Sequence, residues 1–122
     1  PHLSSDAFGL RDETGRVFPV YEDRLGRTHV LNAVETTLID RIPELASMGV
    51  HSLAVDARGR GERYAAGMTA LYREGIGAAF RAHTPRSYWG NLLQRVRAIS
   101  RGGITAGHFE RGVAGYGDNG AE

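Results

Sequence analysis

The chain has 122 residues, of which 41% are hydrophobic and 24% are charged, and its formal net charge is +1. This composition is typical of a globular domain and disfavours disordered, collagen-like and membrane proteins. The sequence contains no cysteine and no lysine, which excludes disulfides, thiolate metal ligands, a cysteine nucleophile, a Schiff-base lysine and a P-loop lysine within this chain. The small net charge does not by itself predict nucleic-acid binding.

The first residues have neither the basic start nor the apolar core of a secretory signal. No apolar run approaches the roughly 20 residues that a membrane helix needs. We therefore expect a cytoplasmic protein. The chain has 15 arginines and no lysine. This usage indicates either a GC-rich genome or the recognition of anions by guanidinium groups.

The N-terminal part is predicted to form a β-hairpin or two neighbouring strands. Turn residues at 12–16 and 23–27 flank an apolar stretch at 17–21, and a second strand is expected at 28–32. Pro19 lies within the first of these strands and indicates an edge strand or a bulge.

The middle of the chain has the alternation of helix and strand that is typical of α/β proteins. A helix is predicted over 33–48, broken or restarted at Pro43 and stopped at Gly49. The short apolar stretch 52–56 predicts a buried parallel strand. Apolar residues on one helical face then predict a long helix over 62–80.

A break at 84–87 precedes a last helix, which Ser87 is expected to cap. Beyond Ser100 the chain is rich in glycine and is predicted to be a loop that becomes a mobile tail. We expect one α/β domain over 1–112 and a flexible tail over 113–122.

A few parallel strands flanked by helices leave exposed sheet edges, and a closed (β/α)₈ barrel takes about 250 residues. The sequence thus predicts an α/β fold that is a partial TIM-barrel-like (β/α) unit, about half a barrel, with a C-terminal helix and a Gly-rich tail. The expected partner is the rest of a longer parent chain or a second copy, as in a homo-oligomer. No membrane partner is expected.

Several motifs follow one another in a characteristic order. They are Phe8-Gly9-Leu10-Arg11-Asp12, Val17-Phe18-Pro19-Val20, Thr28-His29-Val30-Leu31-Asn32-Ala33, Ile42-Pro43-Glu44-Leu45, Leu53-Ala54-Val55-Asp56-Ala57-Arg58 and Thr105-Ala106-Gly107-His108-Phe109-Glu110-Arg111-Gly112. Together they resemble the C-terminal half of the core domain of the peptidase U32 family. The resemblance covers residues 8–112 and implies a TIM-barrel-like parent fold, with this chain supplying its later β/α units.

The chain departs from this family at its cysteines. The family's cysteine-containing signature lies upstream of the matching region and is not present here. Many members also carry cysteines that resemble iron–sulfur ligands in the branches that modify transfer RNA or hydroxylate quinones. The corresponding stretches here are Ser4-Ser5-Asp6 and Thr36-Thr37. Because such clusters need thiolates, no cofactor is expected in this chain.

The end of the predicted strand 52–56 is the strongest candidate site, since ligands of parallel α/β folds lie at the carboxyl ends of strands. Asp56 is a candidate acid, base or orienting carboxylate, with Arg58 beside it as the second candidate catalytic residue. Arg60 is a candidate anion-binding residue. In the alternative, Asp56 caps the loop and both arginines are solvated or pair with other carboxylates.

Two further groups are weaker candidates for substrate or anion binding. Asn32 and Glu35 end the preceding strand and could face the same site, although both are also good helix-start residues. His108 and Arg111 lie in the glycine-rich segment, where His108 could deliver a proton or bind metal if the tail folds over the site. No metal-ligand spacing such as HExxH is present, so no metal site is predicted.

Three functions remain open. The family resemblance implies a proteolytic enzyme, a peptidase or hydrolase whose present chain would not be active alone. An accessory protein of RNA modification or hydroxylation is the second hypothesis, so the substrate could be a peptide or an RNA. The third is a non-catalytic module that dimerises through its sheet edges.

Overall fold

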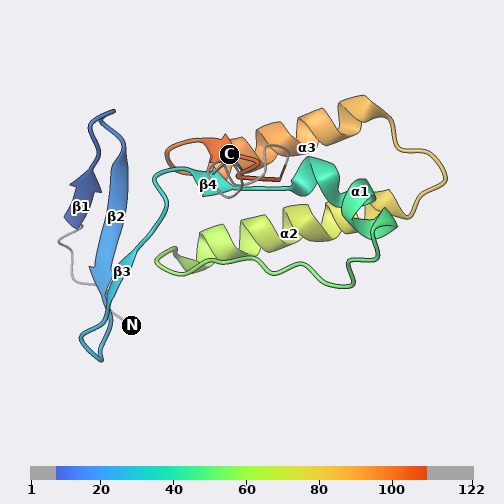
Figure 1. The fold of residues 1–122 in the computed structure, drawn as a ribbon. Helices are drawn as coiled ribbons and strands as arrows, with labels where there is room; N and C mark the ends of the chain where they lie inside the picture. The colour runs from blue at the N-terminus through green and yellow to red at the C-terminus, as the bar shows by residue number, and fades with distance from the viewer. Residues whose placement is uncertain (1–7, 110–122) are drawn as a thin grey trace, which may run out of the picture.

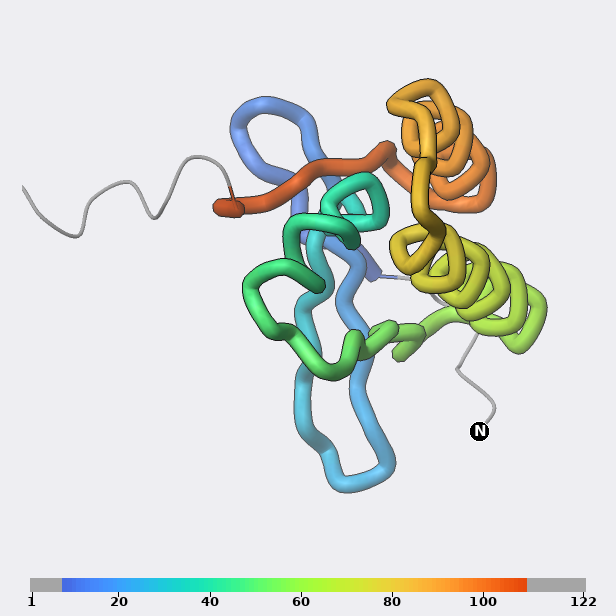
Figure 2. The backbone as a smooth tube through the Cα atoms, turned by 90° about the vertical axis from the view of Figure 1, so that its right-hand side faces the viewer, coloured from blue at the N-terminus to red at the C-terminus, as the bar shows by residue number. Residues whose placement is uncertain are grey.

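The computed structural model describes residues 8–109 and has a mixed α/β fold. A small antiparallel sheet stands to one side of a helical body, and the chain crosses from one to the other through a short strand (Figure 1). The view along the perpendicular direction shows the hairpin of the sheet projecting past the stacked helices (Figure 2). Within the described residues no helix is long and apolar enough to cross a membrane.

The sheet has three antiparallel strands in the order β1-β2-β3. They are β1 (Phe8–Arg11), β2 (Val17–Glu22) and β3 (Thr28–Val30). The predicted hairpin is confirmed as β2 and β3, whereas β1 was not predicted. Phe8 and Leu10 do alternate with Gly9 and Arg11, but the stretch has only four residues, all of them exposed, and it contains glycine, which is depleted in strands.

Aspartates fix both turns of this sheet. Asp12 Oδ1 accepts hydrogen bonds from the backbone N–H groups of Thr14 and Arg16 at 2.9 and 2.8 Å. In the hairpin, Asp23 Oδ1 accepts in the same way from Leu25 and Arg27 at 2.9 and 3.1 Å. These local bonds explain why the turn residues could be recognised from sequence alone.

Pro19 was taken to indicate an edge strand or a bulge, and the edge is wrong, because β2 is the central strand. Its carbonyl oxygen accepts a hydrogen bond of 2.8 Å from the N–H of Leu31, one residue beyond the end of β3. The N–H that proline lacks would have pointed to the same side of the strand. The missing donor therefore falls at the last hydrogen-bonded position, just beyond the end of β3.

The helical body follows the sheet. Its elements are β4 (Glu35–Thr36), the 3₁₀ helix η1 (Ile39–Arg41), α1 (Ile42–Ser47), α2 (Glu62–Ala79), α3 (Arg86–Ile99) and β5 (Ile104–Thr105). Strand β4 pairs in parallel with β5.

The helix predicted over 33–48 is confirmed only in its second half. Residues 35–36 pair with β5 as a strand instead, since tertiary pairing overrides a local helical pattern. Pro43 lies in the first turn of α1, where its missing N–H costs nothing. Gly49 follows the helix with φ of 83°, as predicted for its stop.

The predicted long helix is confirmed as α2, and the last helix as α3. The expected cap at Ser87 is wrong, because Pro85 precedes the helix and no side chain caps it. The core between these helices, η1 and α1 contains Ile39, Ile42, Met68, Leu71, Ala78, Trp89, Leu92 and Val96.

The segment 52–56 is extended but is not a strand, so that prediction is wrong. Leu53 and Val55 pack against the core while Ala54 and Asp56 are exposed, which gives the alternation of a strand. A strand also needs a neighbouring edge, and no strand of the described residues pairs with this segment. The predicted boundary at residue 112 and the tail over 113–122 lie outside the described residues.

Candidate functional site

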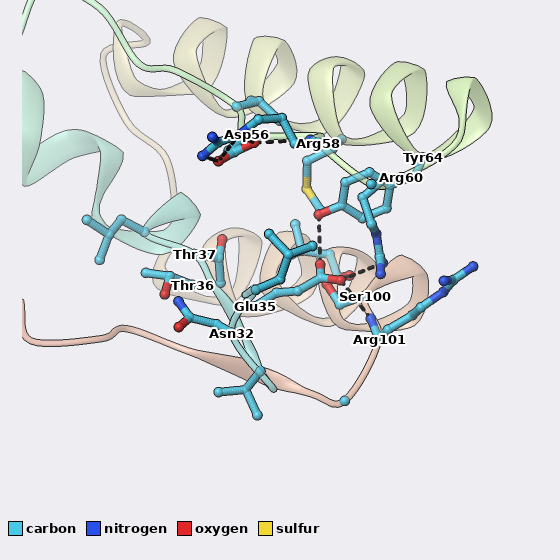
Figure 3. A pocket seen from close by; sticks show the side chains of 18 of the residues that line it. Asn32, Glu35, Thr36, Thr37, Asp56, Arg58, Arg60, Tyr64, Ser100 and Arg101 are labelled. Atoms are coloured by element: carbon cyan, nitrogen blue, oxygen red, sulfur yellow. Dashed lines mark hydrogen bonds and ion pairs between the residues drawn. The ribbon is translucent and has the colours of Figure 1, made fainter. Parts of the chain in front are cut away.

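A cavity of about 740 Å³ opens over the helical body. Residues 31–38 form one wall, and residues 53–56 and 58–60 form the other (Figure 3). Met68, Tyr72 and Val96 also line the cavity. Its volume is within the range of small-molecule sites in proteins. The extended segment 53–56, which lacks a strand partner, is thus an edge of this cavity.

Asp56 and Arg58 form a local ion pair on one wall. Arg58 Nε donates to both carboxylate oxygens at 2.9 and 3.1 Å, and Nη2 donates to Oδ2 at 2.6 Å. Both side chains are exposed. The hydrogen bonds from the Arg58 side chain and backbone lower the pKa of Asp56 to about 2. A carboxylate held in this way is a weak general base at neutral pH, because the most effective bases have pKa values near the working pH.

Glu35 is the centre of a second and more buried network on the opposite wall (Figure 3). Its Oε1 pairs with Arg60 Nη2 at 2.5 Å and accepts from the backbone N–H of Arg101 at 2.9 Å. Its Oε2 accepts from the Tyr64 hydroxyl at 2.7 Å. Glu35 thereby connects β4, the start of α2 and the segment that follows α3.

Tyr64 holds the arginine of this network from a second side. The guanidinium carbon of Arg60 lies 4.2 Å from the centre of the Tyr64 ring, a cation–π geometry. Burial, followed by the hydrogen bond to Glu35, raises the pKa of Tyr64 to about 12. At neutral pH its hydroxyl is therefore a fixed donor, and Arg60 is held between a carboxylate and an aromatic face.

A glycine allows Arg101 to reach Glu35. Gly102 has φ of 71°, and a Cβ at this position would overlap the carbonyl oxygen of Ala33. The next residue, Gly103, accepts a hydrogen bond of 3.1 Å from the N–H of Glu35. Only glycine lets the chain lie this close to the residues before β4. The backbone conformation of Gly102 therefore places the N–H of Arg101 beside Glu35.

Five of the candidate residues identified from the sequence line this one cavity: Asn32, Glu35, Asp56, Arg58 and Arg60. They are not one cluster, since Asp56 and Arg58 pair with each other and Glu35 pairs with Arg60. His108 is exposed in the turn after β5 and is not among the residues that line this cavity. Arg111 lies outside the described residues.

Sequence reasoning missed three residues of the region. Tyr64 lies within the helix predicted over 62–80 and was not identified as a site residue, and Arg63 and Arg101 carried no motif. They meet at a second, smaller cavity of about 310 Å³, lined by Arg60, Gly61, Arg63, Tyr64, Ile99 and Arg101. The signal available in the sequence was position. Arg63 is near the start of the predicted helix 62–80, and Arg101 follows the end of the predicted last helix.

The residues present do not fit an iron–sulfur cluster. The chain has no cysteine, and the described residues contain no group of three or more Asp, Glu or His side chains able to hold a metal ion. Thr37, in the Thr36-Thr37 stretch, is buried, and its hydroxyl lies 2.9 Å from that of Tyr72. This position is thus used for packing.

Comparison with known proteins gives a family and one curated relative. The model of peptidase family U32 matches residues 6–115. Over 97 residues the chain is 28% identical to the tRNA hydroxylation protein P of Escherichia coli (strain K12). The match covers 80% of this chain and 20% of that protein, so the chain spans about a fifth of its relative's length. No solved structure matches the chain.

Proposed function

Because the chain belongs to peptidase family U32, we propose that it forms one wall of the RNA-binding site of a family member that takes part in RNA hydroxylation. The observation that carries this choice is the match, over 80% of the chain, to a relative named for tRNA hydroxylation. That name belongs to the relative, and its extension to this chain is our proposal.

The chemistry of the cavity favours binding over hydrolysis. The carboxylates of Asp56 and Glu35 are both paired with arginine guanidinium groups, and the low pKa of Asp56 makes it a poor base for activating water. Guanidinium groups are instead suited to holding phosphates. We assign no chemical step of the hydroxylation to this chain, and the oxygen donor and redox group would come from elsewhere in the protein.

We further propose that β4 and the extended segment 52–56 are strands of a TIM-barrel-like parent. Two observations support this: β4 and β5 pair in parallel, and the segment 52–56 has the burial alternation of a strand without a paired neighbour in the described residues. The remaining strands would come from the rest of a longer chain. A cytoplasmic location is part of the same proposal.

Proteolysis is a second candidate, favoured by the family description and by the size of the larger cavity. In this case Asp56 and Arg58 would act on a peptide substrate. Their mutual ion pair would have to open before Asp56 could accept a proton from water. The sequence-derived assignment of these two residues as catalytic stays a prediction.

The two candidates can be separated in a strain that lacks the protein containing this chain. We expect total transfer RNA from this strain to lose at least one nucleoside that is 16 Da heavier than its precursor, as measured by liquid chromatography and mass spectrometry. The wild-type gene should restore it. An unchanged nucleoside profile, combined with cleavage of unstructured peptides by the purified protein, would establish the proteolytic alternative instead.

A further inference from the structure

The smaller cavity has an unusual concentration of arginine. Arg60, Arg63 and Arg101 line it together with Tyr64, Ile99 and Gly61, and none of these six residues carries a carboxylate. The net charge of the whole chain is only +1. The positive charge is therefore local, and it is contributed by two segments that are far apart in sequence.

The three arginines are not equivalent. Arg60 is mostly buried and is committed to Glu35 and to the Tyr64 ring. Arg63 and Arg101 are exposed, and neither side chain has a carboxylate partner among the described residues. Two guanidinium groups at one cavity are thus available to a ligand, each with several N–H donors.

The backbone that carries these two arginines is held firmly. Arg63 is in the first turn of α2, next to Tyr64, whose hydroxyl is bonded to Glu35. Arg101 donates its own backbone N–H to the same Glu35 carboxylate. One partly buried carboxylate therefore fixes the distance between the backbones of the two arginines, so that both exposed side chains start from fixed positions at one cavity.

We propose that this cavity binds phosphate groups of an RNA backbone, with Arg63 and Arg101 as the phosphate ligands and Arg60 as a positioning residue. The inference rests on the proposed function for its choice of RNA. Arginine suits this ligand because its planar fork matches phosphate oxygens and remains charged at every physiological pH. The contacts would orient the RNA toward the larger cavity, whose lining shares Arg60, Tyr64 and Arg101 with the smaller one.

The test is binding of a fluorescein-labelled transfer RNA to the full 122-residue chain, measured by anisotropy at several salt concentrations. Replacing both Arg63 and Arg101 by alanine removes two phosphate contacts. At about 0.1 M salt we expect a loss of affinity of roughly 25- to 60-fold, and a slope of log K against log salt that is smaller by about 1.4 to 1.8.

The matched control is Arg73→Ala combined with Arg86→Ala. Arg73 is exposed on α2 and Arg86 on α3, neither lines either cavity, and the change in net charge is identical. We expect the control to bind within about threefold of the wild type. Lysine at positions 63 and 101 should recover part of the affinity, because the charge returns without the fork.

Equal losses in the double variant and the control would overturn the site, since bulk charge would then explain binding. Unchanged binding in the double variant would overturn it as well. Inorganic pyrophosphate separates the sources of phosphate: tight pyrophosphate binding without RNA binding would assign the cavity to a free phosphate compound. The proposed function is tested by a different experiment: it would be overturned if transfer RNA hydroxylation were unchanged in the deletion strain.

Discussion

Two carboxylate–arginine pairs line the same cavity, yet they differ in almost every physical respect. Asp56 and Arg58 are two positions apart in sequence, and their side chains are 57% and 67% exposed. Glu35 and Arg60 are only 19% and 15% exposed. Glu35 also binds groups that lie 29 and 66 positions further along the chain.

The difference determines what each pair does for the fold. A pair two residues apart can form without the tertiary structure and is screened by water and salt, so it stabilises the native state little. The Glu35 network assembles only when β4, α2 and the end of α3 meet. Removing one of its members leaves a charge or donor in a desolvated place. Glu35 is therefore the structural centre of the region, whereas the fold depends little on the exposed pair of Asp56 and Arg58.

The largest expected effect is that of Glu35→Gln. Glutamine keeps the shape of the side chain but leaves the mostly buried Arg60 without its counter-charge, which should lower the free energy of unfolding by about 2–4 kcal/mol. Urea unfolding followed by circular dichroism would measure the loss. If the single variant fails to fold, the combination with Arg60→Met should recover much of the stability, because replacing both partners removes the unpaired charge.

An intermediate effect is expected for Tyr64→Phe. The change removes a hydrogen bond to a charged acceptor and should cost about 1–2 kcal/mol. The pKa of Tyr64 is raised to about 12 in the folded chain, against an ordinary value of 10.0. The stability that the hydroxyl provides is thus complete below about pH 10 and is lost as the pH rises from about 10 toward 12. The wild type and Tyr64→Phe should converge over this window in urea unfolding, and a constant difference would contradict the assignment.

The two regions also differ in how far the sequence predicted them. The turn aspartates, the stop at Gly49 and the helix α2 depend on contacts between near neighbours, so local patterns identified them. Strand β4 depends on pairing with residues 104–105, and no local pattern carries that information. No local pattern predicted the contacts of the site either. Glu35 was a candidate only because it was expected at the end of a strand.

The residues that surround Glu35 show most clearly what could not be predicted from the sequence. Tyr64 has the spacing of a core residue and indeed packs partly against the core, but its hydroxyl is directed to Glu35. Arg101 contributes its backbone N–H, which no side-chain motif reveals. A network assembled from three distant segments can be recognised only once their arrangement in space is known.

The smallest effect on stability is expected for Asp56→Asn. Since the folded-state pKa of Asp56 is lowered from 3.8 to about 2, its contribution is present above about pH 4 and is lost as the pH falls from about 4 toward 2. Exposure weakens the pair further, and at neutral pH the loss of unfolding free energy should be no more than about a quarter of that caused by Glu35→Gln. Urea unfolding of both variants at about pH 7 and about pH 3 measures the ratio. Equal losses at neutral pH would remove the distinction between the two pairs, whereas a loss of function in Asp56→Asn at nearly full stability would show that the exposed pair serves the substrate.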